Sequence, residues 1–263
     1  MTFISINYYD IVCRLIKKGG SWIFGSKPAI HRIPFGPLKG RYIFMSFDIS
    51  PRLFFGFGEP WIAALAQQYL RPGDIVYDLG AHIGYTSLVF AQQVGHTGAV
   101  HAFEIVPSIA EQFLKTTIQA NNFNNIVVHT VGLSDKEQVL KLPVGETMMT
   151  SLYLNPIGEK VELCKTVRLD QYIAQEHLPV PALIKIDIEC AEIECLAGGV
   201  ELLKKCTPLM IIEFHSLDLL KQGYSFLTPL GYKLTTQHET IDNDWLQTKK
   251  QFHESVFCSA GTV

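Results

Sequence analysis

The chain has 263 residues and a net charge of −3, with 48% hydrophobic and 18% charged residues. This length suits one large domain, or a domain with an extension, and the composition is ordinary for a globular protein. The slight negative charge disfavours a broad nucleic-acid-binding surface, and no apolar stretch reaches the roughly 20 residues of a membrane span. The six cysteines include no Cys-x-x-Cys pair, which favours free thiols in a reducing, cytoplasmic compartment.

Residues 1–70 are expected to form an N-terminal extension of helices and strands that packs on the core. Apolar residues recur at helical spacing within 4–15, which predicts an amphipathic helix packed on the core or in a homodimer, with docking on a membrane surface as an alternative. A strand is expected at 41–47. Glu59 and Pro60 then open a helix, because proline suits the first helical turn. The aromatic residues just before this helix either close an edge of the core or form a lid over an acceptor site.

The stretch 73–86 gives the strongest local signal. A short, β-branched apolar run at 75–79 predicts a buried strand. Gly80 and Gly84 then permit a tight turn before a helix that we expect to run to about Val94. Such a turn can cradle a cofactor, because the first N–H groups of a helix have no partner within the helix.

Asp78, at the end of this strand, favours one cofactor class over another. A nicotinamide dinucleotide would need Gly-x-Gly-x-x-Gly and a pyrophosphate at the helix start. Here the second glycine is missing, and the Asp78 carboxylate would repel a pyrophosphate. It would attract the ammonium of a methionine moiety, directly or through backbone and water. The stretch therefore predicts a site for S-adenosylmethionine (SAM), which carries that ammonium and has no phosphate.

The next two strand ends extend the predicted cofactor site. Residues 98–104 resemble a strand with Glu104 at its carboxyl end, where acids grip a ribose diol in nucleotide-binding α/β sheets. After a helix that begins near Pro107, a third strand is expected at 125–131. The loop 132–135 that follows should lie beside the adenine, with backbone groups or Ser134 meeting its edge.

Residues 137–168 interrupt the alternation of strands and helices. Two short strands are expected at its ends, so we interpret the segment as a β insertion between the third and fourth core strands. An insertion at this point lies over the carboxyl ends of the strands, where ligands bind in α/β sheets. Thr150 and Ser151 within it are candidate acceptor contacts, although a simple turn is an equal interpretation.

The last part of the chain completes an α/β sheet that is mostly parallel. The fourth strand, at 181–189, ends in Asp187 and Glu189, and a fifth at 209–214 carries Glu213 and precedes His215. A closing antiparallel hairpin is expected from strands at 232–235 and 256–259, with 237–251 as its loop. We expect a doubly wound core over 71–263.

Several of these segments match a known family. The chain resembles the FkbM family of SAM-dependent methyltransferases from about residue 55 to 232. The segments that carry the resemblance are Glu59-Pro60, Gly73-Asp74, Asp78-Leu79-Gly80-Ala81-His82-Ile83-Gly84-Tyr85, Phe103-Glu104, Leu133-Ser134-Asp135 and Leu183-Ile184-Lys185-Ile186-Asp187-Ile188-Glu189. There are two departures, because the family usually has Gly where Cys190 stands and Pro where Ile105 stands.

The resemblance implies a Class I, Rossmann-like methyltransferase fold and O-methylation of a sugar or a polyketide-like natural product. The candidate cofactor-binding residues are Asp78, Gly80, Ala81, Gly84, Tyr85, Thr86, Glu104, Ile105, Leu133, Ser134 and Asp187. The candidate acceptor-site residues are Glu59, Thr150, Ser151, Glu189 and Glu213.

A hydroxyl acceptor is a poor nucleophile, so a base should assist the transfer. Asp187 is the first candidate, with positioning of the SAM amino group or capping of the following helix as alternatives, and His215 is the second. We assign no metal ligand, although Asp187, Glu189 and Glu213 could hold a divalent ion. Two other functions stay open: a catalytically silent SAM-fold scaffold protein, and a nicotinamide-dependent oxidoreductase.

Overall fold

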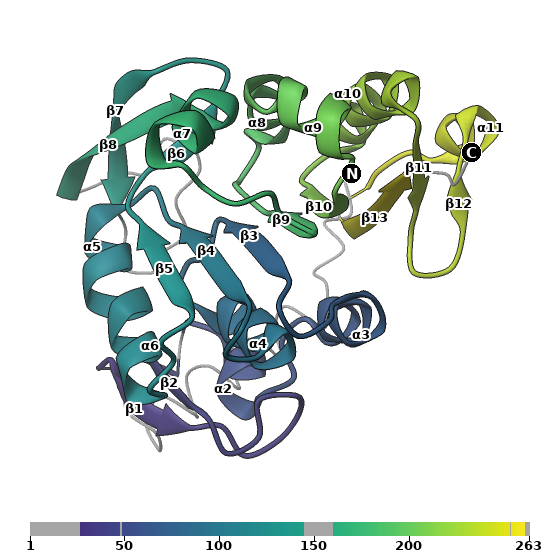
Figure 1. The fold of residues 1–263 in the computed structure, drawn as a ribbon. Coiled ribbons are helices and arrows are strands. Elements are labelled where there is room, and N and C mark those ends of the chain that lie inside the picture. The colour runs from purple at the N-terminus through teal and green to yellow at the C-terminus, as the bar shows by residue number, and fades with distance from the viewer. Residues whose placement is uncertain (1–26, 48, 145–159, 253, 261–263) are drawn as a thin grey trace, which may run out of the picture.

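The centre of the protein is an eight-stranded sheet with the order β12-β11-β13-β10-β9-β3-β4-β5 (Figure 1). The computed structural model describes residues 27–47, 49–144, 160–252 and 254–260. The five strands from β5 to β10 run parallel, and β13 is antiparallel to both of its neighbours. The strands are β3 (Ile75–Leu79), β4 (Ala99–Phe103), β5 (Ile126–His129), β9 (Leu183–Ile186), β10 (Leu209–Phe214), β11 (Tyr232–Thr235), β12 (Thr240–Ile241) and β13 (Glu254–Ala260). This is a doubly wound, Rossmann-like α/β sheet, with the predicted antiparallel hairpin at its C-terminal edge.

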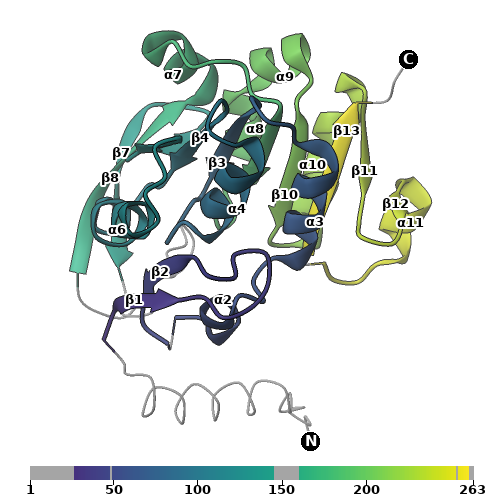
Figure 2. The same cartoon turned by 60° about the horizontal axis from the view of Figure 1, so that its bottom comes forward.

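Helices cover both faces of the sheet (Figures 1 and 2). One face carries α3 (Pro60–Tyr69), α4 (Tyr85–Val94), α5 (Pro107–Ile109), the π-helical turn η1 (Ala110–Leu114) and α6 (Lys115–Ala120). The other carries α7 (Leu169–Glu176), α8 (Glu192–Gly198), α9 (Val200–Cys206), α10 (Leu217–Leu227) and the 3-10 turn η2 (Thr228–Leu230). Successive strand residues point to opposite faces, so Val76 packs with the first group and Tyr77 with the second.

The described part of the N-terminal segment packs on the α4 face of the sheet. It contains an antiparallel pair, β1 (Ala29–Arg32) and β2 (Tyr42–Met45), and the short helix α2 (Pro51–Phe55) (Figure 2). Phe54 and Phe55 contact Phe47 edge to face, and all three belong to the apolar cluster that includes α4. None of the helices in the described part of the chain has the length and apolarity that crossing a bilayer requires.

The segment after β5 builds a second, three-stranded sheet. It consists of β6 (Gly132–Ser134), β8 (Lys160–Arg168) and β7 (Gln138–Val144), with β8 in the middle. We expected a loop at β6, but its residues pair in parallel with β8. The candidate acceptor contacts Thr150 and Ser151 lie outside the described residues.

The predicted loop at 237–251 contains regular structure. Besides β12 it holds the helix α11 (Asn243–Thr248). The helix begins there because Asp242 caps it: its carboxylate accepts a hydrogen bond of 2.7 Å from the Trp245 N–H.

Candidate active site

A cavity of about 370 Å³ opens where the order of the parallel strands reverses. From β3 the chain continues on one side to β4, whereas the later strand β9 lies on its other side and leads to β10. Ligands bind at such a switch point in α/β sheets, beyond the carboxyl ends of the strands. The predicted site residues that line the cavity are Gly80, Glu104, Ile105, Leu133, Ser134, Asp187 and Glu189.

Gly80 fits this point because its backbone is left-handed and pressed against β9. Its φ is +83°, and a Cβ atom there would collide with the carbonyl oxygen of Asp187. The N–H groups of Gly80 and Ala81 both donate to the carbonyl of Phe103, at 3.0 and 2.9 Å, and the Gly84 N–H donates to Ala81. These turn N–H groups are therefore satisfied within the protein, whereas the prediction of unpaired N–H groups concerns the first turn of α4, which begins at Tyr85.

Glu104 lies at the predicted place, directly after β4, and its carboxylate holds the turn together. One oxygen accepts a hydrogen bond from the His82 N–H and the other from the Val106 N–H, both at 2.9 Å. Burial raises the pKa of Glu104 to about 7, although the two backbone N–H groups and Lys185 oppose the shift. A buried acid with free lone pairs beside the cavity can still accept hydrogen bonds from a ribose diol.

Asp78 is completely buried and does not line the cavity. Its Oδ2 accepts hydrogen bonds from the hydroxyls of Thr86 and Ser87, at 2.8 and 2.5 Å. Its Oδ1 lies 3.7 Å from the Lys185 ammonium. This arrangement favours the second form of the prediction, a contact with the methionine ammonium through backbone and water, because the carboxylate is enclosed by α4 and Lys185. The hydrogen bond from its hydroxyl to Asp78 holds the Thr86 side chain at the start of α4.

Three other predicted cofactor contacts also serve packing. A Cβ atom on Gly84 would meet the Leu114 side chain at 2.8 Å, so this glycine allows η1 to approach closely. The Tyr85 hydroxyl donates to the carbonyl of Gly56 at 3.0 Å and ties α4 to the N-terminal segment. Ala81 is buried among apolar residues. These three residues do not line the cavity, and neither do Asp78 and Thr86.

The predicted adenine side of the cavity is more apolar. Ile105 and Leu133 line it, together with Phe103 and Leu140. The Ser134 hydroxyl lies at the same wall and donates to the Asp135 carboxylate at 3.1 Å. An apolar slot with a few polar groups at its edge suits a heteroaromatic ring.

Asp187 follows β9 and is the link between the cavity and a polar cluster. Its Oδ2 accepts a hydrogen bond of 3.1 Å from Lys185, whose ammonium is buried. Burial alone would raise the pKa of Asp187, but Lys185 and His215 lower it below its ordinary value. The carboxylate is therefore ionised and only weakly basic. The helix-cap alternative is wrong, because Ala191 occupies the N-cap of α8.

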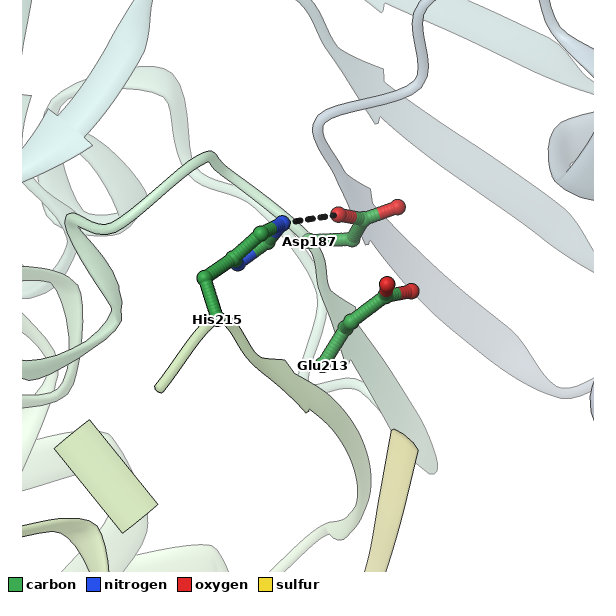
Figure 3. Close-up of side chains that lie close together, drawn as sticks. All are labelled: Asp187, Glu213 and His215. Atoms are coloured by element: carbon green, nitrogen blue, oxygen red, sulfur yellow. Dashed lines mark ion pairs between the residues drawn. The ribbon is translucent and has the colours of Figure 1, made fainter. Parts of the chain in front are cut away.

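Glu213 and His215 lie beside Asp187 at the end of the next strand, as Figure 3 shows. The His215 Nε2 atom is 3.7 Å from Asp187 and 3.5 Å from Glu189. Its Nδ1 atom donates to the fully buried Glu192 at 2.6 Å. Burial would lower the pKa of His215, but Glu192 and the other carboxylates raise it to about 9. A cationic imidazole is no base at neutral pH, which weakens the second prediction.

Glu213 shows the opposite behaviour, since burial, Asp187 and Glu59 raise its pKa. Glu59, a predicted acceptor-site residue, is therefore close enough to Glu213 to affect its pKa. Neither Glu59 nor Glu213 lines the cavity.

The loop after Asp187 adopts an unusual backbone. Glu189 and Cys190 have φ angles of +52° and +74°, a region that non-glycine residues rarely occupy. The resembling family usually has glycine at position 190, and the geometry gives the reason. Cys190 keeps the glycine conformation at the cost of strain beside the site.

Three polar residues of the site were missed by the sequence analysis. Lys185 bridges Asp78 and Asp187, Glu192 orients His215, and His82 lines the cavity. Lys185 stands among apolar residues in the predicted fourth strand. A lysine at such a buried position needs an acidic partner, and this was the signal in the sequence.

Comparison with known proteins identifies the family. A model described as "Methyltransferase FkbM domain" matches residues 78–234, more than half of the chain. The chain belongs to this family. SAM is therefore its methyl donor, and the predictions of family and cofactor are confirmed.

The chain is also similar to individual proteins. The chain is 28% identical over 209 residues to 31-O-demethyl-FK506 methyltransferase FkbM of Streptomyces tacrolimicus, with 65% of this chain and 77% of the relative covered. It is 33% identical over 82 residues to a protein-L-isoaspartate O-methyltransferase of Ignicoccus hospitalis, over 31% and 38% of the two chains. The crystal structure of an FkbM methyltransferase from Methylobacillus flagellatus aligns with a TM-score of 0.48 and 18% identity. That alignment covers 76% of this chain and about half, 51%, of the other.

Proposed function

We propose that the protein transfers the SAM methyl group to a hydroxyl oxygen of a sugar or a polyketide-like natural product. The observation that carries this proposal is the position of Asp187, which lines the cavity while Glu213 and His215 gather beside it. A relative whose name describes 31-O-methylation of an FK506 precursor supports oxygen as the acceptor atom.

In this proposal the chain's residues mainly align the reactants. Glu104 accepts hydrogen bonds from the ribose hydroxyls, Ile105 and Leu133 contact the adenine, and Asp187 accepts a hydrogen bond from the acceptor hydroxyl. The acceptor oxygen then forms a bond to the methyl carbon as the carbon–sulfur bond breaks. Sulfur keeps that electron pair and becomes a neutral thioether, and the hydroxyl proton leaves to water. Alignment of this kind accounts for much of the acceleration of displacement reactions.

The test is incubation of the purified protein with SAM and a panel of glycosides and hydroxylated macrolides. We expect S-adenosylhomocysteine to form only when an acceptor is present, with a methyl ether in the product by NMR. Methylation at nitrogen or carbon would contradict the proposed acceptor atom. SAM binding without turnover on any member of the panel would favour the silent scaffold alternative.

A further inference from the structure

Three potential ligand side chains meet at the carboxyl ends of β9 and β10. One ligand atom each from Asp187, Glu213 and His215 lies within 4.8 Å of the others (Figure 3). The strand register explains why: Ile212 pairs with Ile186, so the residues that follow them, Glu213 and Asp187, stand side by side. His215 is two residues beyond Glu213 and continues along the same edge of the sheet.

A second, independent feature is the way in which the imidazole is held. Glu192 has no exposed surface, and its Oε1 accepts hydrogen bonds from the His215 Nδ1 atom at 2.6 Å and from the Cys190 N–H at 3.1 Å. This leaves Nε2 directed at the carboxylates of Asp187 and Glu189. Histidines that bind metals commonly donate their other ring N–H to a carboxylate in this way, which fixes the ring and the tautomer.

The charges around the cluster point in the same direction. Four carboxylates lie around Lys185 and His215, and the Lys185 ammonium is already engaged by Asp78. The four carboxylates are those of Asp187, Glu189, Glu192 and Glu213. Negative charge therefore exceeds positive charge at a half-buried site next to the cavity, an arrangement that a divalent cation would neutralise.

We propose that Asp187, Glu213 and His215 bind a divalent first-row transition-metal cation, with Glu192 as the positioning residue for His215. Two carboxylates and one imidazole suit Mn²⁺, Fe²⁺ or Zn²⁺, because carboxylates favour Mn²⁺ and imidazole favours iron and zinc. The role of the cation rests on the proposed function. Its charge beside the acceptor oxygen lowers the pKa of the hydroxyl, so that the proton is lost to water before the oxygen attacks the methyl carbon.

The experiment is a titration of chelator-treated protein with Mn²⁺, in which the EPR signal reports free Mn²⁺. We expect one Mn²⁺ per wild-type chain. Asp187→Asn, Glu213→Gln and His215→Gln should each weaken binding at least tenfold, and Glu192→Gln by roughly 10–100-fold, the range for outer-shell partners. Glu111→Gln is the matched control with unchanged binding, because that exposed acid pairs with Lys115 on the surface.

Circular dichroism and urea unfolding, measured on the same samples, identify the variants that remain folded, and only these are compared. The proposal is overturned if wild type binds neither Mn²⁺ nor Zn²⁺ at one ion per chain. It is also overturned if folded ligand variants bind Mn²⁺ as wild type does. Failure of the proposed function gives a different result: a cation that is bound and lost in the three variants, together with no methyl transfer to any hydroxyl acceptor.

Discussion

The ammonium of Lys185 lies 3.7 Å from the Oδ1 atom of Asp78, and both side chains are almost completely buried. The pair joins neighbouring strands, because the register places Asp78 of β3 opposite Lys185 of β9. Removing one partner of a buried pair typically destabilises a protein by about 3–5 kcal/mol when the other charge is left without compensation. Lys185 keeps Asp187 as a partner, so we expect Asp78→Asn to lower the free energy of unfolding in urea titrations by less than this, about 1–3 kcal/mol.

A control for this prediction is Asp218→Asn, which removes an acid from the first turn of α10, far along the chain from the pair. Its effect should be small. If Asp78→Asn left the unfolding free energy unchanged but abolished SAM binding, Asp78 would act at the ligand, as the sequence first suggested.

Gly84 gives a second stability prediction. Its φ is +92°, and a Cβ atom would press on Leu114 rather than on the cavity. A non-glycine residue in the left-handed region costs about 1–2 kcal/mol. Gly84→Ala should therefore lower the unfolding free energy by at least this amount, while calorimetry shows little change in SAM affinity. Gly95→Ala is the comparison, because it shares the positive φ but meets no neighbour within 4 Å. A folded Gly84→Ala protein with no SAM affinity would contradict this assignment.

Cys190 allows the opposite test, a stabilising change. Because its φ is +74°, glycine should relieve the strain, although part of the gain is offset by the greater freedom of glycine in the unfolded chain. We expect Cys190→Gly to raise the unfolding free energy by roughly 0.5–1.5 kcal/mol. Cys190→Ala removes the thiol and keeps the strain, so it should not stabilise. If both variants stabilised the protein equally, the gain would come from loss of the thiol and not from relief of backbone strain.

Local patterns were sufficient to predict the sheet and the cofactor turn. The apolar run at 75–79, the glycines after it and the acid after β4 each lie within a few residues of the feature that they determine. The hairpin of β11 and β13 was likewise visible as two apolar strands near the end of the chain.

The missing parts depend on pairing between distant segments. Lys185 meets Asp78 only through the register of β9 with β3, and Glu192 meets His215 only because α8 packs beside the end of β10. The strand β6 has three residues and is defined by β8, more than 25 residues later, so its sequence alone resembles a loop. Burial similarly converted Asp78 from a predicted ligand contact into an internal partner.

Glu104 predicts a pH dependence of cofactor binding. Burial raises its pKa to about 7, and the ribose hydroxyls need the ionised carboxylate as acceptor. SAM affinity should therefore be constant above pH 7 and fall as the pH drops below it, by about tenfold per unit as the ionised fraction falls. Titrations with SAM over this range test the expectation. Glu104→Gln should bind more weakly but without this dependence, whereas an unchanged pH profile in that variant would exclude Glu104 as its origin.

The final prediction separates two roles for Asp187. If it orients the acceptor hydroxyl, Asp187→Asn should lower turnover by roughly 10²–10⁴-fold, the usual contribution of acid–base groups, and leave the SAM dissociation constant nearly unchanged. If it holds the methionine ammonium, affinity should fall and turnover should recover at saturating SAM.

The structure favours the first outcome. The Lys185 ammonium already donates to Asp187 at 3.1 Å, so a second ammonium at the same carboxylate would have to approach a buried positive charge. An acceptor hydroxyl meets no such repulsion and can use the remaining oxygen, which lies on the His215 side. Single-turnover rates at saturating SAM, together with calorimetric dissociation constants, distinguish the two roles. Unchanged turnover with unchanged affinity would contradict both, and would leave Asp187 only as the partner that keeps Lys185 buried.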